Sequence, residues 1–155
     1  MNTIYRTATA LCFLLISMNL FAQQQERPIK WVGSVEQTKA DSATLVFTAN
    51  IDKEWHIYSQ FTPDGGPIAT VFTYPKTTSF TLAGKTSEPK ADEAFDKDFG
   101  VKVLTLKGSP VFKQTIAVKD KKKFTVPVKI DYEACKDKCL FLDTTIVMTI
   151  NLKTK

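Results

Sequence analysis

The sequence is poor in side chains that bind metals. Its 155 residues include one histidine, His56, and three cysteines. A structural zinc site takes four protein ligands and a catalytic one takes three and a water, so two cysteines and His56 would still need a carboxylate. Copper(I) accepts Cys and Met, but Met148 falls in the apolar register of a predicted strand and is interpreted as a core residue. We predict no metal site and no cofactor.

Long hydrophobic runs are absent beyond residue 21. The N-terminal stretch MNTIYRT carries one arginine and no acidic residue, and the apolar run ATALCFLLISMNLF follows it. This is the pattern of a secretory signal peptide, and the run is too short for a comfortable transmembrane helix. We predict a signal peptide at residues 1–22, cleaved after Ala22, which also removes Cys12. The remaining chain is expected to be exported and to have no membrane span of its own.

No charge of one sign dominates the chain. Removal of residues 1–22 takes away one basic residue, Arg6, and lowers the net charge from +5 to +4 over 133 residues. The lysines are scattered, apart from the cluster KDKKK at 119–123, which is typical of a solvated turn, so nucleic-acid binding is not predicted. The sequence also lacks internal repeats and a domain boundary, and its length suits one domain at 23–155.

Helical periodicity is absent as well, and apolar and polar residues alternate instead. Such alternation predicts strands with one buried and one solvent-facing side. In the segment 124–134 the predicted solvent-facing residues are Thr125, Pro127, Lys129, Asp131 and Glu133. The predicted strands are 29–37, 43–51, 55–60, 70–75, 79–84, 101–108, 111–119, 124–134 and 145–152. The polar segment 87–100 is predicted to be a loop with a helical turn. Short strands divided by turn signals predict an all-β, immunoglobulin-like antiparallel β-sandwich.

The stretch YEACKDKCLFL holds the two cysteines of the predicted mature chain, Cys135 and Cys139. One ends a strand pattern and the other nearly begins the next, so the pair is predicted to bracket a turn at the rim of the sandwich. A structural disulfide is one interpretation, although closing a loop of about five residues stabilises a fold by only ~2 kcal/mol. Metal ligation is a second. A reactive dithiol is a third, because the nearby Lys136 and Lys138 favour the thiolate. The spacing alone leaves the redox and structural interpretations open.

Three stretches that follow one another along the chain carry a family resemblance. They are WHIYSQFTPDGGPIATVFTY at 55–74, FDKDFG at 95–100 and VKIDYEACKDKCLF at 128–141. Together they resemble the N-terminal periplasmic domain of DsbD, the transmembrane thiol:disulfide interchange reductase of Gram-negative bacteria, in the stand-alone form of Bacteroidetes-like sources. The resemblance covers almost the whole mature chain. It implies an immunoglobulin-like domain in the periplasm.

The resemblance also implies a function. Domains of this family receive electrons from a thioredoxin-like donor and pass them to oxidised periplasmic proteins, including disulfide isomerases and cytochrome-maturation factors. This chain would then be a protein-disulfide reductase component that works through thiol–disulfide interchange and needs no cofactor. The alternative is a non-catalytic binding module of the cell envelope with a structural disulfide. Redox potential separates the two, because structural disulfides of exported proteins typically lie below roughly −300 mV.

Specific residues acquire roles through the resemblance. Cys135 and Cys139 match the redox pair, with Cys139 as the sulfur that exchanges with partners and Cys135 as the one that closes the intramolecular disulfide. The residues expected to shield or flank the pair are Asp98 and Phe99 in a cap loop, and His56 and Tyr58 beside the sulfurs.

Overall fold

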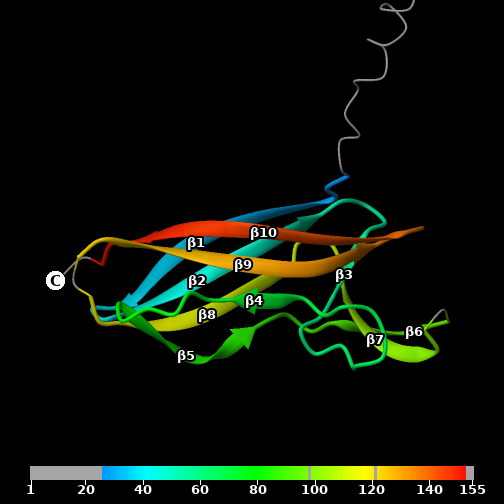
Figure 1. The fold of residues 1–155 in the computed structure, drawn as a ribbon, viewed down its shortest axis with the longest axis horizontal. Coiled ribbons are helices and arrows are strands. Elements are labelled where there is room, and N and C mark those ends of the chain that lie inside the picture. The colour runs from blue at the N-terminus through cyan, green and yellow to red at the C-terminus, as the bar shows by residue number, and fades with distance from the viewer. Residues whose placement is uncertain (1–25, 98, 121, 153–155) are drawn as a thin grey trace, which may run out of the picture.

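The computed structural model describes residues 26–97, 99–120 and 122–152 (Figure 1). The predicted signal peptide, residues 1–22, and the predicted cap residue Asp98 lie outside these ranges. The described residues form ten strands and no helix: β1 Ile29–Lys39, β2 Ser42–Ile51, β3 His56–Tyr58, β4 Val71–Thr73, β5 Phe80–Ser87, β6 Asp92–Asp96, β7 Val101–Leu106, β8 Val111–Val118, β9 Phe124–Cys135 and β10 Cys139–Ile150. This part of the chain thus contains no helix that could cross a membrane.

The strands form two sheets in which every pairing is antiparallel. One sheet has the order β1-β2-β8-β5, and the other has the order β10-β9-β3-β7-β6, with β4 also paired to β9. β3 pairs with residues 134–135 of β9 and β4 with residues 129–131, so the two short strands follow one another along the same edge. The arrangement confirms the predicted all-β, immunoglobulin-like antiparallel β-sandwich.

Aromatic rings from both sheets meet in the core. Their centroids lie 5.1–6.0 Å apart, at distances where such pairs stabilise a fold by about 0.5–1.5 kcal/mol beyond their buried area. The residues are Trp31, Phe47 and Phe112 in the first sheet and Phe72 and Tyr132 in the second. Because Tyr132 is anchored in this cluster, the end of β9 that carries Cys135 is held against the sandwich.

The structure corrects the prediction for the segment 87–100. Instead of a loop with a helical turn, it contains the strand β6, which pairs along its whole length with β7. Four of the five β6 residues are exposed, so neither side of the strand is apolar and alternation could not reveal it. Backbone hydrogen bonds to β7, and not a buried face, define this edge strand.

Candidate functional site

The cysteine pair lies at the tip of the β9–β10 hairpin. β9 ends at Cys135, β10 begins at Cys139, and the two residues are partners in the strand register. Their sulfurs form an intramolecular disulfide. The turn that was predicted at the rim of the sandwich is confirmed, and it shares one end of the molecule with the β6–β7 hairpin (Figure 1).

The two sulfurs differ in their access to solvent. Cys135 is only 3% exposed and packs with the buried side chains of Tyr58 and Val103, while Val101 lies partly buried against them. Cys139 is exposed. A protein partner can therefore reach Cys139 first, and Cys135 is shielded by β3 and β7.

The lysines of the turn are bound to carboxylates. Lys136 Nζ lies 2.7 Å from Glu54 Oε2, and Lys138 Nζ lies 2.6 Å from Glu26 Oε2. The hydrogen bond and the charge of Glu54 raise the pKa of Lys136. Each lysine charge is therefore partly neutralised by a carboxylate a few ångströms away, so the two lysines stabilise a cysteine thiolate less than the sequence suggested. The pairs also fasten the turn to two other segments of the chain.

His56 and Tyr58 of β3 lie beside the pair. His56 is the register partner of Cys135, and its Nε2 is 3.2 Å from the Tyr58 hydroxyl. Burial and the charge of Lys107 lower the pKa of His56, partly offset by Asp96. Burial, followed by the charges of Asp96 and Glu133, raises the pKa of Tyr58 to about 12. Near neutral pH the imidazole can therefore accept the hydrogen bond that the Tyr58 hydroxyl donates.

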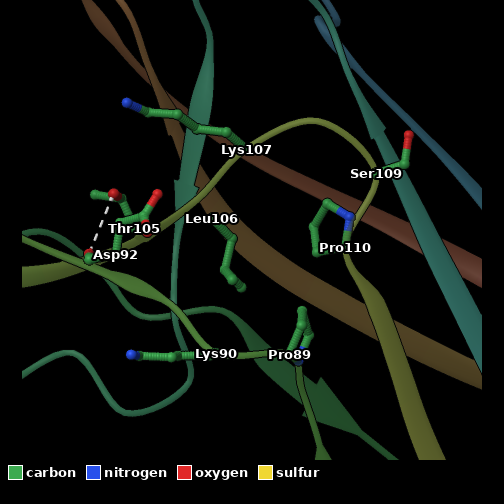
Figure 2. A pocket seen from close by; sticks show the side chains of 8 residues that line it. All are labelled: Pro89, Lys90, Asp92, Thr105, Leu106, Lys107, Ser109 and Pro110. Atoms are coloured by element: carbon green, nitrogen blue, oxygen red, sulfur yellow. Dashed lines mark hydrogen bonds between the residues drawn. The ribbon is translucent and has the colours of Figure 1, made fainter.

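Lys107 lines a shallow hollow of about 250 Å³ (Figure 2). Its walls come from the segment before β6, from the end of β7 and from the turn that leads to β8. At one side of the hollow, Thr105 Oγ1 donates to the carbonyl oxygen of its register partner Asp92 at 3.4 Å (Figure 2). The lining residues are Pro89, Lys90, Asp92, Thr105, Leu106, Lys107, Ser109 and Pro110. The lining contains no cysteine, and one of its residues, Lys107, lowers the pKa of His56.

Phe99 lies in the turn between β6 and β7. Its side chain is 48% exposed, and its amide donates to Asp96 Oδ1 at 3.2 Å. The residues of the hairpin that pack on the Cys135 side are Val103 and, in part, Val101. The geometry thus brings the β6–β7 hairpin to the pair, while the shielding role expected of Phe99 stays a prediction.

Glu133 is a site residue that the sequence pattern misassigned. The alternation of β9 predicted it to face solvent, yet it is only 3% exposed. Its Oε2 accepts a hydrogen bond of 2.7 Å from the amide of Ile68, and its Oε1 lies 3.8 Å from Cys135 Sγ. The segment around Ile68 covers this part of the sheet, and no local pattern encodes that contact. The sequence did contain one indication that Glu133 lies near the sulfur, because residues two apart in a strand, here Glu133 and Cys135, lie on the same side.

This carboxylate and the two sulfurs form a tight group. One oxygen of Glu133, Cys135 Sγ and Cys139 Sγ all lie within 4.8 Å of one another. Metals bind the thiolate form of cysteine, and sulfurs joined in a disulfide offer none. The observed geometry is that of a disulfide beside a buried carboxylate.

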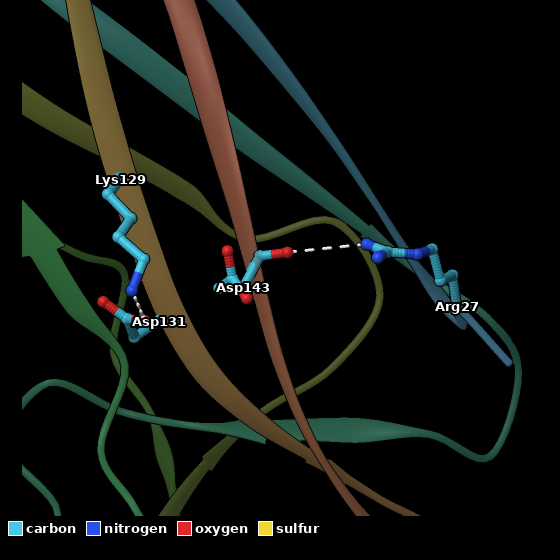
Figure 3. A network of polar contacts seen from close by, with 4 residues as sticks. All are labelled: Arg27, Lys129, Asp131 and Asp143. Carbon is cyan, nitrogen blue, oxygen red and sulfur yellow. Dashed lines mark hydrogen bonds and ion pairs between the residues drawn. The ribbon is translucent and has the colours of Figure 1, made fainter. Parts of the chain in front are cut away.

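An apolar surface continues from Cys139 along β10. Phe141, two residues further on the same side of the strand, is 66% exposed, and Ile68 is also exposed. Both line a hollow of about 220 Å³ together with Asp131 and Asp143. Two polar contacts involve the acidic residues of this lining (Figure 3). Lys129 Nζ lies 2.5 Å from Asp131 Oδ1, and Arg27 Nη1 donates to the Asp143 carbonyl oxygen at 3.5 Å.

Comparisons with known proteins agree with this fold and give its family. The family model described as "Thiol:disulfide interchange protein DsbD, N-terminal" matches residues 23–151. The N-terminal periplasmic domain of ScsB from Proteus mirabilis has a TM-score of 0.61 at 10% identity, over 81% of this chain and 47% of that one. The reduced N-terminal domain of DsbD from Neisseria meningitidis has a TM-score of 0.51 at 17% identity, over 78% and 86%.

The chain thus spans about half the length of the Proteus mirabilis structure. No curated protein sequence matches it significantly.

Proposed function

This chain belongs to the family of the N-terminal domain of the thiol:disulfide interchange protein DsbD, and we propose from that membership that it carries electrons in the periplasm. Cys135 and Cys139 are the carriers, a thioredoxin-like protein is the donor, and oxidised periplasmic proteins, including cytochrome-maturation factors, are the acceptors. The observation that carries the proposal is the disulfide at a hairpin tip with one exposed and one buried sulfur. A disulfide that serves only as a staple has no need of an exposed sulfur.

Export is part of the proposal. Residues 1–22 act as a cleaved signal peptide, and residues 23–155 form the mature domain. In support, the family match begins at residue 23, directly after the predicted cleavage at Ala22.

The exchange proceeds in two displacements. In the reduced domain the Cys139 thiolate attacks one sulfur of an oxidised partner, forming a mixed disulfide while the partner's other sulfur leaves as a thiolate. Cys135 then loses its proton and attacks Cys139 Sγ, which restores the Cys135–Cys139 disulfide and releases the partner's first sulfur as a thiolate. Both partner thiolates take up protons, so two electrons and two protons reach the partner. A thioredoxin-like donor resets the domain by the same steps in reverse.

Neighbouring residues serve the encounter in this proposal. Phe141 and Ile68 are exposed apolar residues near Cys139 and form the docking surface for partners. Phe99, with Asp98 before it, caps the pair when no partner is bound. His56 and Tyr58 support the Cys135 side.

Single-cysteine variants test the roles of the two sulfurs. The probe is a thioredoxin with one active-site cysteine, activated as a mixed disulfide with thionitrobenzoate so that attack releases the coloured thiol. We expect reduced Cys135→Ser to form a covalent adduct at least about tenfold faster than Cys139→Ser, because its remaining thiol is exposed. Adduct is identified on non-reducing gels and by mass spectrometry.

The alternative outcomes are informative. Faster reaction of Cys139→Ser would exchange the two roles. A third outcome is that neither folded variant reacts faster than the same variant unfolded in urea. If the wild-type potential also lies below roughly −300 mV, the disulfide is structural and the binding-module alternative is correct.

A further inference from the structure

Glu133 offers a charged group to a sulfur that is otherwise enclosed. Its Oε1 lies 3.8 Å from Cys135 Sγ, and its Oε2 is fixed by the amide of Ile68 at 2.7 Å. In the oxidised protein Cys135 Sγ carries no proton, so this contact is not a hydrogen bond. Once the pair is reduced, Cys135 carries an S–H that can donate to Oε1, because sulfur hydrogen bonds are longer than those of oxygen.

Other titratable groups face the pair from every element packed around it. They are His56 and Tyr58 of β3, Cys139 of β10, and Lys136 and Lys138 in the turn. Asp96 of β6 and Lys107, which follows β7, act on the two β3 side chains. Tyr58 is protonated near neutral pH, and both lysines are held in ion pairs with carboxylates. The neutral His56 already accepts the Tyr58 hydroxyl at Nε2, whereas Glu133 Oε1 lies directly against Cys135 Sγ. Glu133 is therefore better placed than any of these groups to take a proton from Cys135.

We propose that Glu133 is the proton acceptor for Cys135 when this thiol resolves the mixed disulfide at Cys139. The proposal rests on the exchange function given above and assigns that reaction a further catalytic residue. As Cys135 Sγ attacks Cys139 Sγ, its proton passes to Glu133 Oε1, its electron pair forms the new S–S bond, and the partner sulfur leaves with the electrons of the broken bond. The carboxylic acid then returns its proton to water, from which the released partner thiolate is protonated.

The same carboxylate keeps the two sulfurs different between reactions. A negative charge near Cys135 opposes a second negative charge on its sulfur, so the buried cysteine rests as a thiol. Cys139 lies on the same side of the hairpin but is exposed to solvent, which hydrates a negative charge on its sulfur, so it supplies the thiolate that meets partners. Burial and the fixed carboxylate thus both favour the thiol form of Cys135 over the thiolate.

The test uses Ellman's disulfide as the oxidant, so it needs no protein partner. The first thionitrobenzoate is released when Cys139 attacks the reagent, and the second when Cys135 resolves the mixed disulfide. In Glu133→Gln, resolution must wait for a free Cys135 thiolate, so its rate should rise roughly tenfold per pH unit between about pH 5 and pH 7. Wild type should change by less than about threefold over that range, because the acceptor is built in.

Two further variants complete the test. Glu133→Asp keeps a carboxylate and should keep the shallow pH profile, which a merely structural role would not predict. Asp131→Asn removes a charge two residues away on the same side of β9 and should leave the profile unchanged. An equally steep profile in wild type and Glu133→Gln would overturn the proposal, even if adducts with thioredoxin confirm the exchange function.

Folding is checked by circular dichroism. Should Glu133→Gln not fold, carbon-13 NMR of the Glu133 carboxyl in wild type replaces it. Coupling to Cys135 requires the carboxyl titration to differ between the reduced and oxidised protein. Identical titrations in both redox states would then reject the assignment.

Discussion

Phe99 occupies a turn whose backbone is held by one residue, Asp96. The Phe99 amide donates to Asp96 Oδ1 at 3.2 Å, and the Gly100 amide donates to the Asp96 carbonyl at 2.9 Å. Gly100 has a φ of 69°, a left-handed conformation that glycine adopts without steric conflict. Asp96 thus specifies the turn through its side chain and its carbonyl, and the turn does not need the half-exposed ring of Phe99. The ring is therefore free for the shielding role proposed above.

Replacement of Phe99 by alanine should separate shielding from folding. We expect the reduced thiols of Phe99→Ala to react faster with a bulky maleimide, because the proposed cap loses its ring. The free energy of unfolding should change by less than about 1 kcal/mol, as is usual for an exposed residue. Phe95→Ala is the matched control, since Phe95 is an exposed ring on the same hairpin and should not alter the alkylation rate.

Two results would count against the cap. Equal alkylation rates in Phe99→Ala and wild type would show that the ring does not shield the pair. A stability loss of about 3–5 kcal/mol would instead identify Phe99 as a core residue.

At the scale of elements, the fold depends on how β1 and β10 meet. These strands are the outer strands of different sheets, and they pack against each other where the sandwich closes. Gly33 of β1 makes this approach possible. A Cβ at this position would lie 2.4 Å from Ile146 Cγ2 and 3.2 Å from Met148 Sδ, both on β10.

Gly33→Ala should therefore destabilise the protein. Overpacking at a close contact typically costs about 1–3 kcal/mol, because the neighbouring side chain must leave its preferred position. Thermal unfolding should show a lower midpoint than that of Ser34→Ala, whose exposed position makes it the local control. A Gly33→Ala variant as stable as the control would mean that β1 and β10 can move apart at little cost.

At the scale of the whole molecule, alternation identified the sandwich, and contacts between distant segments built the site. The β9 pattern predicted the buried Tyr132 and the end of the strand at Cys135, because those features are local. The same pattern placed Glu133 in solvent, since its burial depends on the segment around Ile68. The pairing of Lys136 with Glu54 joins residues 82 positions apart. Contacts of this kind lie beyond any local sequence pattern.

Alkaline pH should reveal the enclosure of the tyrosines across the molecule. Burial raises the pKa of Tyr58 and of Tyr74 to about 12 from the usual 10, with the charges of Asp96 and Glu133 adding to the effect at Tyr58. The folded state therefore holds these protons more tightly than the unfolded state. Their contribution to stability is complete below pH 10 and is lost as the pH rises from 10 to about 12.

Denaturant unfolding at a series of alkaline pH values, with tyrosinate absorbance, measures this loss. Tyr74→Phe should begin less stable, since it lacks the 2.8 Å hydrogen bond to Thr86, and should then lose stability less steeply above pH 10. A slope equal to that of wild type would show that Tyr74 ionises without unfolding.

The unequal burial of the two sulfurs also governs what happens when the exposed one meets the wrong molecule. A lone surface thiol in an oxidising compartment would join two copies of the protein covalently, and such dimers would persist. Here any bond formed by Cys139 has Cys135 directly behind it, as its partner in the strand register. With the proposed roles, that thiol ends an unproductive attachment as readily as a productive one. The buried sulfur thus limits the lifetime of such covalent dimers and restores the Cys135–Cys139 disulfide.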